Sequence, residues 1–368
     1  MMARWLRPLF IALTALAMCA PGDWSTQAQS PGRPIKFIIT NPPGGVPDTL
    51  ARIVGRRLQE RLGQTVVIEN RPGANGGIAI NALIGSPADG QTFVVTDGSI
   101  LSINPQVYGK LSYDPKDVAP VAYLAQAPLF LAIHPKVPVD TIKEFVEYAR
   151  ARPGQLNYGS SGVGSIHHIS MEGFKSALKL NITHVPFKGA GESVPALLGG
   201  HVEVLFSAYP ALSGAAGTNR VKLLASSGAE RSPQAPDLPA ISELIPGFNF
   251  ASNMGIYARV GTSAVVMQKI AAEASAVVKE PDVINQLSIV GVEPKGGGPE
   301  EFDRVLKDEI KRVGHVVKTV GIRLDLGLRF SPVRRALRPG VRNDRTEGGP
   351  GLAAPRESGF GPSRRTTL

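Results

Sequence analysis

The segment NPPGGVPDTLARIVGRRL, residues 41–58, has residue types that could bind a small anion. Gly44 and Gly45 allow the backbone to turn and to approach a ligand closely. Asp48 is predicted to cap an amphipathic helix over Thr49–Leu62, and a helix N-terminus offers partial positive charge and unpaired N–H groups. A carboxylate could therefore be held there without any lysine or arginine. The alternative is an ordinary helix start, in which the glycines only turn the chain and Asp48 only caps the helix.

A second glycine-rich loop, residues 70–77, repeats this pattern ahead of another predicted helix. In α/β proteins, ligands bind beyond the carboxyl ends of the strands, where loops lead into helices. Two such loops at the edge of one sheet therefore favour a shared pocket.

A third loop, YGSSGVGSIHH at residues 158–168, also precedes a predicted helix. Hydroxyls and glycines ahead of a helix can form an anion-binding concavity, and a neutral imidazole can donate one hydrogen bond. At least one of His167 and His168 could therefore contact a ligand. The alternative is that the histidines only pack or cap the helix.

The same loop lacks the spacing of common catalytic and cofactor motifs. Gly162 follows Ser161 one residue too early for a G-x-S-x-G nucleophile elbow, and no third glycine completes a dinucleotide fingerprint. His167 and His168 are adjacent, so on a helix they point to different faces and make a poor zinc pair. The sequence therefore predicts no catalytic residue, no metal and no cofactor.

Strand and helix patterns alternate along the chain, which predicts an α/β fold with parallel sheets covered on both faces. The predicted strands are residues 35–40, 65–69, 92–96, 156–158 and 182–185. The predicted helices are residues 49–62, a segment ending at 84, and residues 141–151, 165–178, 192–198 and 299–318. Gly63 is placed as the left-handed residue that ends the first helix. Two apolar runs, Leu129–Ile133 and Phe250–Tyr257, are predicted to be strands that cross between two lobes.

The net charge of +10 would suggest a nucleic-acid binder if it were concentrated on a folded surface. Most of the excess instead lies in residues 326–368, which contain nine arginines and three acidic residues. A chain of 368 residues with 43% apolar and 19% charged residues can bury a full core and is long enough for two domains. The composition therefore favours a soluble protein with a modest positive charge, and not a nucleic-acid binder.

Residues 1–28 have the pattern of a secretory signal peptide. Two arginines precede the apolar run Leu9–Ala20, which is too short to span a bilayer. The only cysteine, Cys19, lies in this segment, so the mature chain would have no disulfide. The alternative is a lipoprotein anchored through Cys19. Export makes a periplasmic location the expected one.

Seven separated segments resemble the tripartite tricarboxylate transporter substrate-binding family, often called Bug receptors. They are PPGGVPDTLARIVGRRLQERLGQTVVIENRPGANGGIA, SPADGQTFVV, INPQVYGKLSYDP, GQLNYGSSGVGSIHH, HVPFKGAG, LLGGHVEVLF and PGFNF, in this order over about residues 33–325. The resemblance implies a periplasmic-binding-protein fold of type II, in which two α/β lobes are joined by hinge strands and the ligand lies between them. It also implies a receptor that delivers a small carboxylate to a membrane permease.

The resemblance carries over to individual positions of this sequence. The implied contacts are Gly44, Gly45, Asp48, Gly73, Ala74 and Asn75 from one lobe, and Ser160, Ser161, Ser165, His168, Lys188 and Gly189 from the other, with Ser207 nearby. Val46 and Pro47 depart from the family, which usually has glycine or a small hydroxyl residue there. Ser207 stands where many relatives carry an aspartate that could pair with a ligand amine. We therefore expect a plain mono- or dicarboxylate ligand.

The resemblance also divides the chain. Residues 1–28 would be the signal peptide, residues 29–130 and 256–325 one lobe, and residues 131–255 the other lobe. Residues 326–368 would be a disordered tail, because they cannot bury enough apolar surface to offset their chain entropy. Cutting the chain after Asp325 should then leave folding and binding intact.

The expected partners are the carboxylate and the permease subunits of a tripartite tricarboxylate transporter, with no nucleic acid, and we expect a monomer. Two other functions remain open. A sensor that docks on a membrane signalling partner would have the same pocket. An exported enzyme acting on a carboxylate would need a base or nucleophile, and the His-Ser cluster has no evident acidic partner in the sequence.

Overall fold

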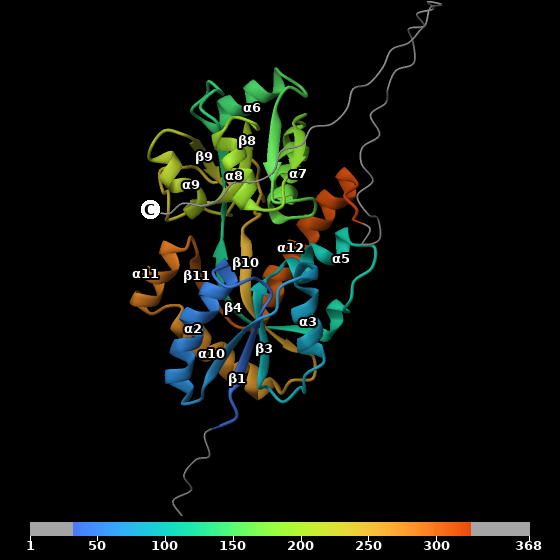
Figure 1. The fold of residues 1–368 in the computed structure, drawn as a ribbon, viewed down its shortest axis with the longest axis vertical. Helices are drawn as coiled ribbons and strands as arrows, with labels where there is room; N and C mark the ends of the chain where they lie inside the picture. Colours follow the sequence, from blue (N-terminus) through green and yellow to red (C-terminus); the bar gives the residue numbers. More distant parts are fainter. Residues whose placement is uncertain (1–31, 325–368) are drawn as a thin grey trace, which may run out of the picture. The chain divides into compact units, whose positions relative to one another are not determined.

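The computed structural model describes residues 32–324, and its strands form two sheets (Figure 1). The predicted signal peptide and the predicted disordered tail lie outside the described residues. The first sheet has the order β11-β4-β10-β3-β1-β2, and the second has the order β7-β6-β8-β5-β9. The first sheet consists of β1 (Ile35–Ile39), β2 (Val66–Asn70), β3 (Thr92–Asp97), β4 (Val118–Ala127), β10 (Ser252–Arg259) and β11 (Glu293–Gly297). The second consists of β5 (Leu129–Ile133), β6 (Asn157–Ser160), β7 (Thr183–Pro186), β8 (Val204–Ala208) and β9 (Lys222–Ser226).

The prediction of parallel sheets is correct only in part, because both sheets are mixed. In the first sheet β1 pairs in parallel with β2 and β3, whereas β10 runs antiparallel to β3 and β4. In the second, β6 pairs in parallel with β7 and β8, whereas β5 runs antiparallel to β8 and β9. The reason is the connection between the sheets. Strand β4 runs into β5 across the single residue Pro128, and the chain returns to the first sheet in the opposite direction as β10.

The apolar strands are buried on both faces, as expected for sheets covered by helices. In β1, Ile35, Phe37 and Ile39 belong to one apolar cluster and Ile38 belongs to another, because side chains alternate along a strand. Strand β5 alternates in the same way between two clusters around the second sheet. The helices that cover the sheets are α2 (Val46–Leu62), α3 (Gly77–Ile84), α4 (Ser99–Ser102), α5 (Asn104–Val107), α6 (Ile142–Arg150), α7 (Ile166–Leu178), α8 (Ala190–Leu198), α9 (Tyr209–Ala216), α10 (Ala264–Val277), α11 (Pro281–Ile289) and α12 (Pro299–Val320).

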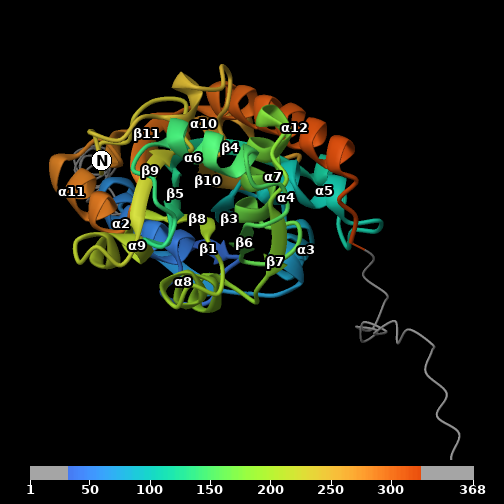
Figure 2. The same cartoon turned by 90° about the horizontal axis from the view of Figure 1, so that it is seen from above.

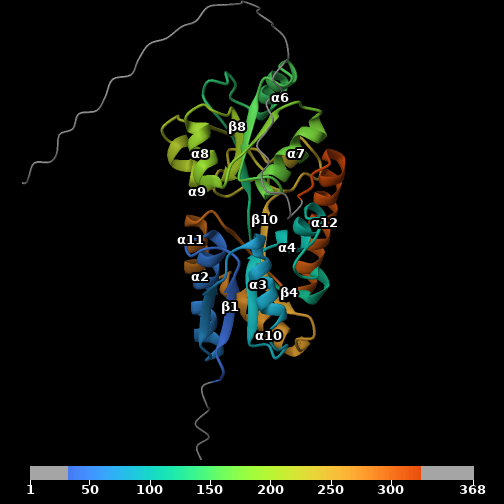
Figure 3. The same cartoon turned by 45° about the vertical axis from the view of Figure 1, so that its right-hand side comes forward.

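Each sheet has helices on both faces. Around the first sheet, α2, α10 and α11 share one apolar cluster, and α3, α4 and α12 share the other (Figure 3). Around the second sheet, α6 and α7 lie on one face and α8 and α9 on the other (Figure 2). The predicted helices are all present within two or three residues of their predicted bounds, and Gly63 ends α2 with a φ of 62°.

The last helix, α12, contacts β4 and β10 of the first sheet and also α7, which covers the second sheet (Figures 1 and 3). Phe302 and Leu306 belong to a cluster of the first sheet, whereas Val313 and Val317 belong to a cluster of the second. The predicted lobe limits place this helix in the first lobe. The exact lobe limits remain a prediction.

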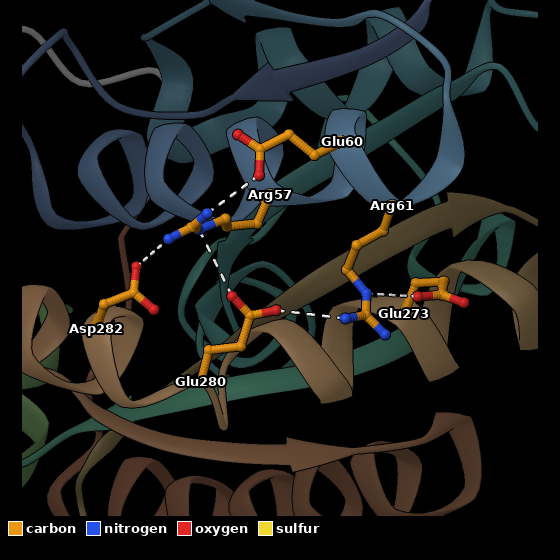
Figure 4. A network of polar contacts seen from close by, with 6 residues as sticks. All are labelled: Arg57, Glu60, Arg61, Glu273, Glu280 and Asp282. Carbon is orange, nitrogen blue, oxygen red and sulfur yellow. Dashed lines mark hydrogen bonds and ion pairs between the residues drawn. The ribbon is translucent and has the colours of Figure 1, made fainter.

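Arginines on the outer face of α2 form ion pairs with acidic residues of α10 and α11 (Figure 4). Arg61 Nε lies 2.6 Å from Glu273 of α10, and both Arg57 and Arg61 contact Glu280, which precedes α11. Arg57 also contacts Asp282. These side chains are partly exposed, so solvent screens the pairs and each adds little to stability. None of the helices within residues 32–324 has both the length and the apolar character needed to cross a bilayer.

Candidate ligand-binding site

A cavity of about 550 Å³ lies where loops of both sheets meet. Its wall is built from four segments: the loop after β1, the turn after β2, the end of β3 with α4, and the loop between β6 and α7. The lining residues are Thr40, Asn41, Pro42, Pro72, Gly73, Ala74, Asn75, Gly76, Thr96, Asp97, Ser99, Ile100, Ile103, Asn104, Ser161, Val163, Gly164, Ser165, Ile166 and His167. The first three segments follow parallel strands of the first sheet, so the cavity lies beyond their carboxyl ends.

Five of the predicted contacts line this cavity: Gly73, Ala74, Asn75, Ser161 and Ser165. The other eight, Gly44, Gly45, Asp48, Ser160, His168, Lys188, Gly189 and Ser207, are outside the lining. Two of the three glycine-rich loops therefore meet at one cavity. The first loop contributes only through Thr40, Asn41 and Pro42, which precede its glycines.

The turn over Gly73–Gly76 has a backbone conformation that points to a functional role. All four residues have positive φ, including the non-glycine residues Ala74 at 48° and Asn75 at 47°. A left-handed conformation at a residue such as alanine costs of the order of 1–2 kcal/mol, and such strain is concentrated at functional sites. Asn104 holds the turn in place, because its Nδ2 donates to the Asn75 carbonyl at 2.8 Å. The N–H groups of Ala74 and Asn75 in this turn have no main-chain acceptor within the described residues.

The N-terminus of α7 forms the facing wall. Ile166 and His167 are its first two residues, so their N–H groups have no acceptor within the helix. The Ser161 Oγ and the His167 Nδ1 are buried atoms of cavity-lining residues, and neither has a hydrogen-bond partner within the described chain. Burial lowers the pKa of His167 to about 4, so the imidazole is neutral at pH 7. These groups can donate hydrogen bonds to a carboxylate.

His168, one of the contacts that the resemblance implies, forms its contacts within the loop and with His184. Its ring stacks on His184 with a centroid distance of 4.1 Å, and its Nδ1 accepts the N–H of Gly164 at 3.1 Å. The helix begins at Ile166, and its second residue, His167, lines the cavity. Ser165 is the N-cap, with its hydroxyl donating to Gly162 at 2.7 Å. The Ser160 hydroxyl likewise lies 2.7 Å from His184 Nε2.

The polar groups of the first glycine loop form hydrogen bonds within the protein. Asp48 is not the N-cap that the sequence predicted. Helix α2 begins three residues earlier than expected, at Val46, with Gly45 as the N-cap. The buried Asp48 carboxylate reaches back and accepts the Gly44 N–H at 2.9 Å, while Asn70 Nδ2 donates to it at 2.8 Å. Burial would raise the pKa of Asp48, but hydrogen bonds from Arg52, Gly44 and Asn70 outweigh it and lower the pKa.

Replacing Asp48 with alanine should lower the free energy of unfolding by about 2 kcal/mol, because two donors in a largely buried site lose their acceptor. The loss of a cap alone would cost about 1 kcal/mol. Urea unfolding of Asp48→Ala measures the difference, with Asp48→Asn as the control that keeps one acceptor oxygen. Equal stability of the alanine variant and the unmodified protein would contradict this account of the loop.

The remaining predicted contacts lie elsewhere. Lys188 and Gly189 precede α8, where the Lys188 N–H donates to Glu192 at 3.1 Å. Ser207 is buried in β8 opposite Phe130, and its Oγ has no partner within the described residues. Because Ser207 does not line the cavity, its identity carries no direct information about a ligand amine there.

Several lining residues were missed by the sequence analysis, among them Thr40, Thr96, Asp97 and Asn104. Thr40 and Thr96 share a hydrogen bond of 2.6 Å between their hydroxyls. Both follow or end predicted strands, so the rule that ligands bind beyond the carboxyl ends of strands could have found them. Among the lining residues there is no lysine and no arginine.

A two-lobed solute-binding protein is the class that this fold and cavity define, and comparisons with known proteins agree. Residues 50–322 match the family described as tripartite tricarboxylate transporter family receptor. The chain is 30% identical to the protein BugT of Bordetella pertussis over 329 residues, which cover 88% of this chain and 99% of BugT. The chain belongs to the tripartite tricarboxylate transporter receptor family.

Two solved structures share the fold and contain small dicarboxylates. The R. palustris protein Rpa4515 with adipate is 34% identical, with a TM-score of 0.70 over 80% of this chain and 100% of that protein. MatC from Rhodopseudomonas palustris, with bound malate, is 29% identical, with a TM-score of 0.64 over 78% of this chain and 99% of MatC. The predicted family and the predicted two-lobed α/β fold are thus confirmed. The members of this family are periplasmic solute-binding receptors.

Proposed function

We propose that this chain is a periplasmic receptor that binds a small carboxylate in the cavity and delivers it to the permease of a tripartite tricarboxylate transporter. The observation that supports this most is the facing pair of N–H-rich segments, the turn at Gly73–Gly76 and the start of α7, around a cavity without lysine or arginine. Peptide N–H groups and a helix N-terminus bind anions well. The relatives solved with adipate and malate favour a carboxylate.

The proposed mechanism is hinged capture without chemistry. Pro128 and the segment before β10 join the two sheets, so rotation about them would open and close the cavity. A ligand that moves a mostly open population to a mostly closed one must prefer the closed form by roughly 10⁴-fold, or about 5.5 kcal/mol. Several hydrogen bonds to a charged group, at about 1.5–3 kcal/mol each, can supply this preference.

The proposal also covers the cellular location and the oligomeric state of the protein. An exported, monomeric receptor fits the signal-peptide pattern of residues 1–28 and the periplasmic location of the family.

A purified receptor is expected to leave its carboxylate unchanged on prolonged incubation, and turnover measured by chromatography would show an enzyme instead. A pull-down from membranes with and without ligand should recover permease subunits. Recovery of a signalling sensor in their place would contradict the transport role.

A thermal-shift screen against a library of small carboxylates is the first test. A ligand present at 100 times its dissociation constant adds about 2.7 kcal/mol to the free energy of unfolding, which raises the melting temperature measurably. At least one carboxylate should do so. A complete library without any stabilising compound would contradict the proposal.

A pair of serine variants then tests the cavity itself. Ser161 and Ser207 both have a buried hydroxyl without a hydrogen-bond partner within the described chain, but only Ser161 lines the cavity. Ser161→Ala is expected to weaken carboxylate binding about 10- to 100-fold without loss of stability, because it removes only a donor that the ligand uses. Ser207→Ala should change neither quantity. Calorimetry gives both affinities, and equal affinity of the two variants would place the ligand elsewhere.

A further inference from the structure

The cavity wall carries one carboxylate whose outer oxygen is unused. Asp97 ends β3 and lines the cavity. Its Oδ1 accepts the N–H of Ser99 at 2.8 Å, whereas its Oδ2 accepts no hydrogen bond from residues 32–324. No lysine, arginine or histidine of the described chain forms an ion pair with Asp97. The Oδ2 atom is therefore open to a ligand.

Asp97 is also the only charged side chain among the lining residues. The cavity has no lysine or arginine, and His167 is neutral at pH 7 because burial lowers its pKa to about 4. The other polar groups on the wall are hydroxyls, amides and main-chain N–H groups. No other side chain of the cavity wall neutralises Asp97. A positive group of the ligand would therefore be attracted to its carboxylate, and a negative group would be repelled.

The donors for a carboxylate come from other segments of the same wall. The N–H groups of Ala74 and Asn75 in the turn have no main-chain acceptor within the described residues, and those of Ile166 and His167 have none within α7. A carboxylate held by these donors leaves the rest of the ligand to contact Asp97. A second carboxylate there would face a like charge in a partly enclosed site, whereas an ammonium group would pair with the Oδ2 atom and donate to it.

We propose that Asp97 selects a ligand that carries an ammonium group in addition to its carboxylate, that is, a small amino acid in the broad sense. This inference rests on the proposed function. It reverses the expectation of a plain mono- or dicarboxylate, which depended on Ser207. Ser207 is outside the cavity, and the acidic side chain that could pair with an amine is supplied instead by β3.

The test compares ligands that differ only in the amine. Succinate and aspartate, glutarate and glutamate, and butyrate and 4-aminobutyrate form three such pairs, and malate supplies a neutral hydroxyl in place of the amine of aspartate. Calorimetry at pH 7 should show the amino member of at least one pair binding at least tenfold more tightly than its plain partner. Malate should bind more weakly than aspartate, because a hydroxyl does not balance the charge of Asp97.

The variant Asp97→Asn keeps an oxygen for the Ser99 N–H and removes only the charge. It should abolish the tenfold advantage of the amino ligand and leave the plain partner unchanged or bound more tightly. The inference is overturned if plain ligands bind as tightly as amino ligands in every pair that binds, or if the variant weakens both members equally. It is also overturned if aspartate binds and malate binds as tightly. The comparison of pairs on the unmodified protein decides the question even if the variant does not fold. Absence of binding by all seven compounds and by the wider carboxylate library would instead contradict the proposed function.

Discussion

Replacing Glu309 with glutamine should raise the free energy of unfolding at pH 8 by about 3 kcal/mol and leave it nearly unchanged at pH 4. Glu309 lies on α12 and is only 6% exposed. Burial raises its pKa from the ordinary 4.5 to about 7, although hydrogen bonds from Asn253 and Ser102 oppose the shift. Below pH 4.5 the carboxyl is protonated in both the folded and the unfolded chain. As the pH rises from 4.5 through 7, this stabilising contribution is lost, and the difference between the two pKa values corresponds to about 3 kcal/mol.

The hydrogen bonds around Glu309 explain why the neutral form fits. The Ser102 hydroxyl contacts both the Gly98 carbonyl, at 3.0 Å, and the Glu309 Oε1, but it has one proton to donate. A protonated Glu309 can donate to Ser102, and Ser102 can then donate to Gly98. The other carboxyl oxygen accepts from Asn253 Nδ2 at 2.7 Å. A glutamine amide supplies the same donor and acceptor without the charge.

Urea unfolding between pH 4 and pH 8 measures this effect. The unmodified protein should lose stability as the pH rises through 7 relative to Glu309→Gln. Asp308→Asn, at an exposed position of the same helix, is the matched control and should follow the unmodified protein. If Glu309→Gln and the unmodified protein lose stability in parallel over this range, the buried carboxyl is not the cause.

Replacing Gly255 with alanine should lower the free energy of unfolding by at least about 3 kcal/mol. A Cβ at this position of β10 would lie 2.3 Å from the Ala122 carbonyl oxygen of β4 and 2.3 Å from the Phe302 ring of α12. The carbonyl belongs to the sheet backbone, and Phe302 is stacked on Tyr123 with a centroid distance of 5.4 Å, so neither can move cheaply. Overpacking of this kind costs about 1–3 kcal/mol, and more where backbone is involved.

The control for Gly255 is Gly214, in the middle of α9. A Cβ at Gly214 meets nothing within 4 Å, so Gly214→Ala should raise stability by up to about 1 kcal/mol through better helix propensity. Urea unfolding of the two variants gives opposite signs if the close approach of α12 to β10 is correct. Equal stability of Gly255→Ala and the unmodified protein would show that α12 does not pack on the sheet in this way.

The regular elements followed from local sequence. The alternation of buried faces in β1, the amphipathic stripe of α2 and the left-handed Gly63 each depend on short-range physics, so pattern alone places them. The antiparallel direction of β10 depends on where the chain returns from the second sheet, which no local pattern encodes. The buried Glu309 had a local signal, because it falls on the same stripe of α12 as Phe302, Leu306 and Val313.

Only the parts of the site that have a local sequence pattern could be predicted. Loops rich in glycine are visible in sequence, and two of the three line the cavity. Adjacent positions of a helix point in different directions, and only the packing around α7 shows that His167, and not His168, lines the cavity. Asp97 carries no motif, and only the meeting of four segments from distant parts of the chain brings it to the cavity wall.

The central claim is that donors from both sheets converge on one carboxylate, and a crystal structure with a ligand found in the thermal-shift screen tests it most directly. The account predicts ligand density in the cavity, with a carboxylate within hydrogen-bond distance of Ser161 and of the N–H groups of Ala74 or Asn75 and of Ile166 or His167. Ligand density at another place, or a carboxylate contacted by one sheet's loops alone, would contradict it.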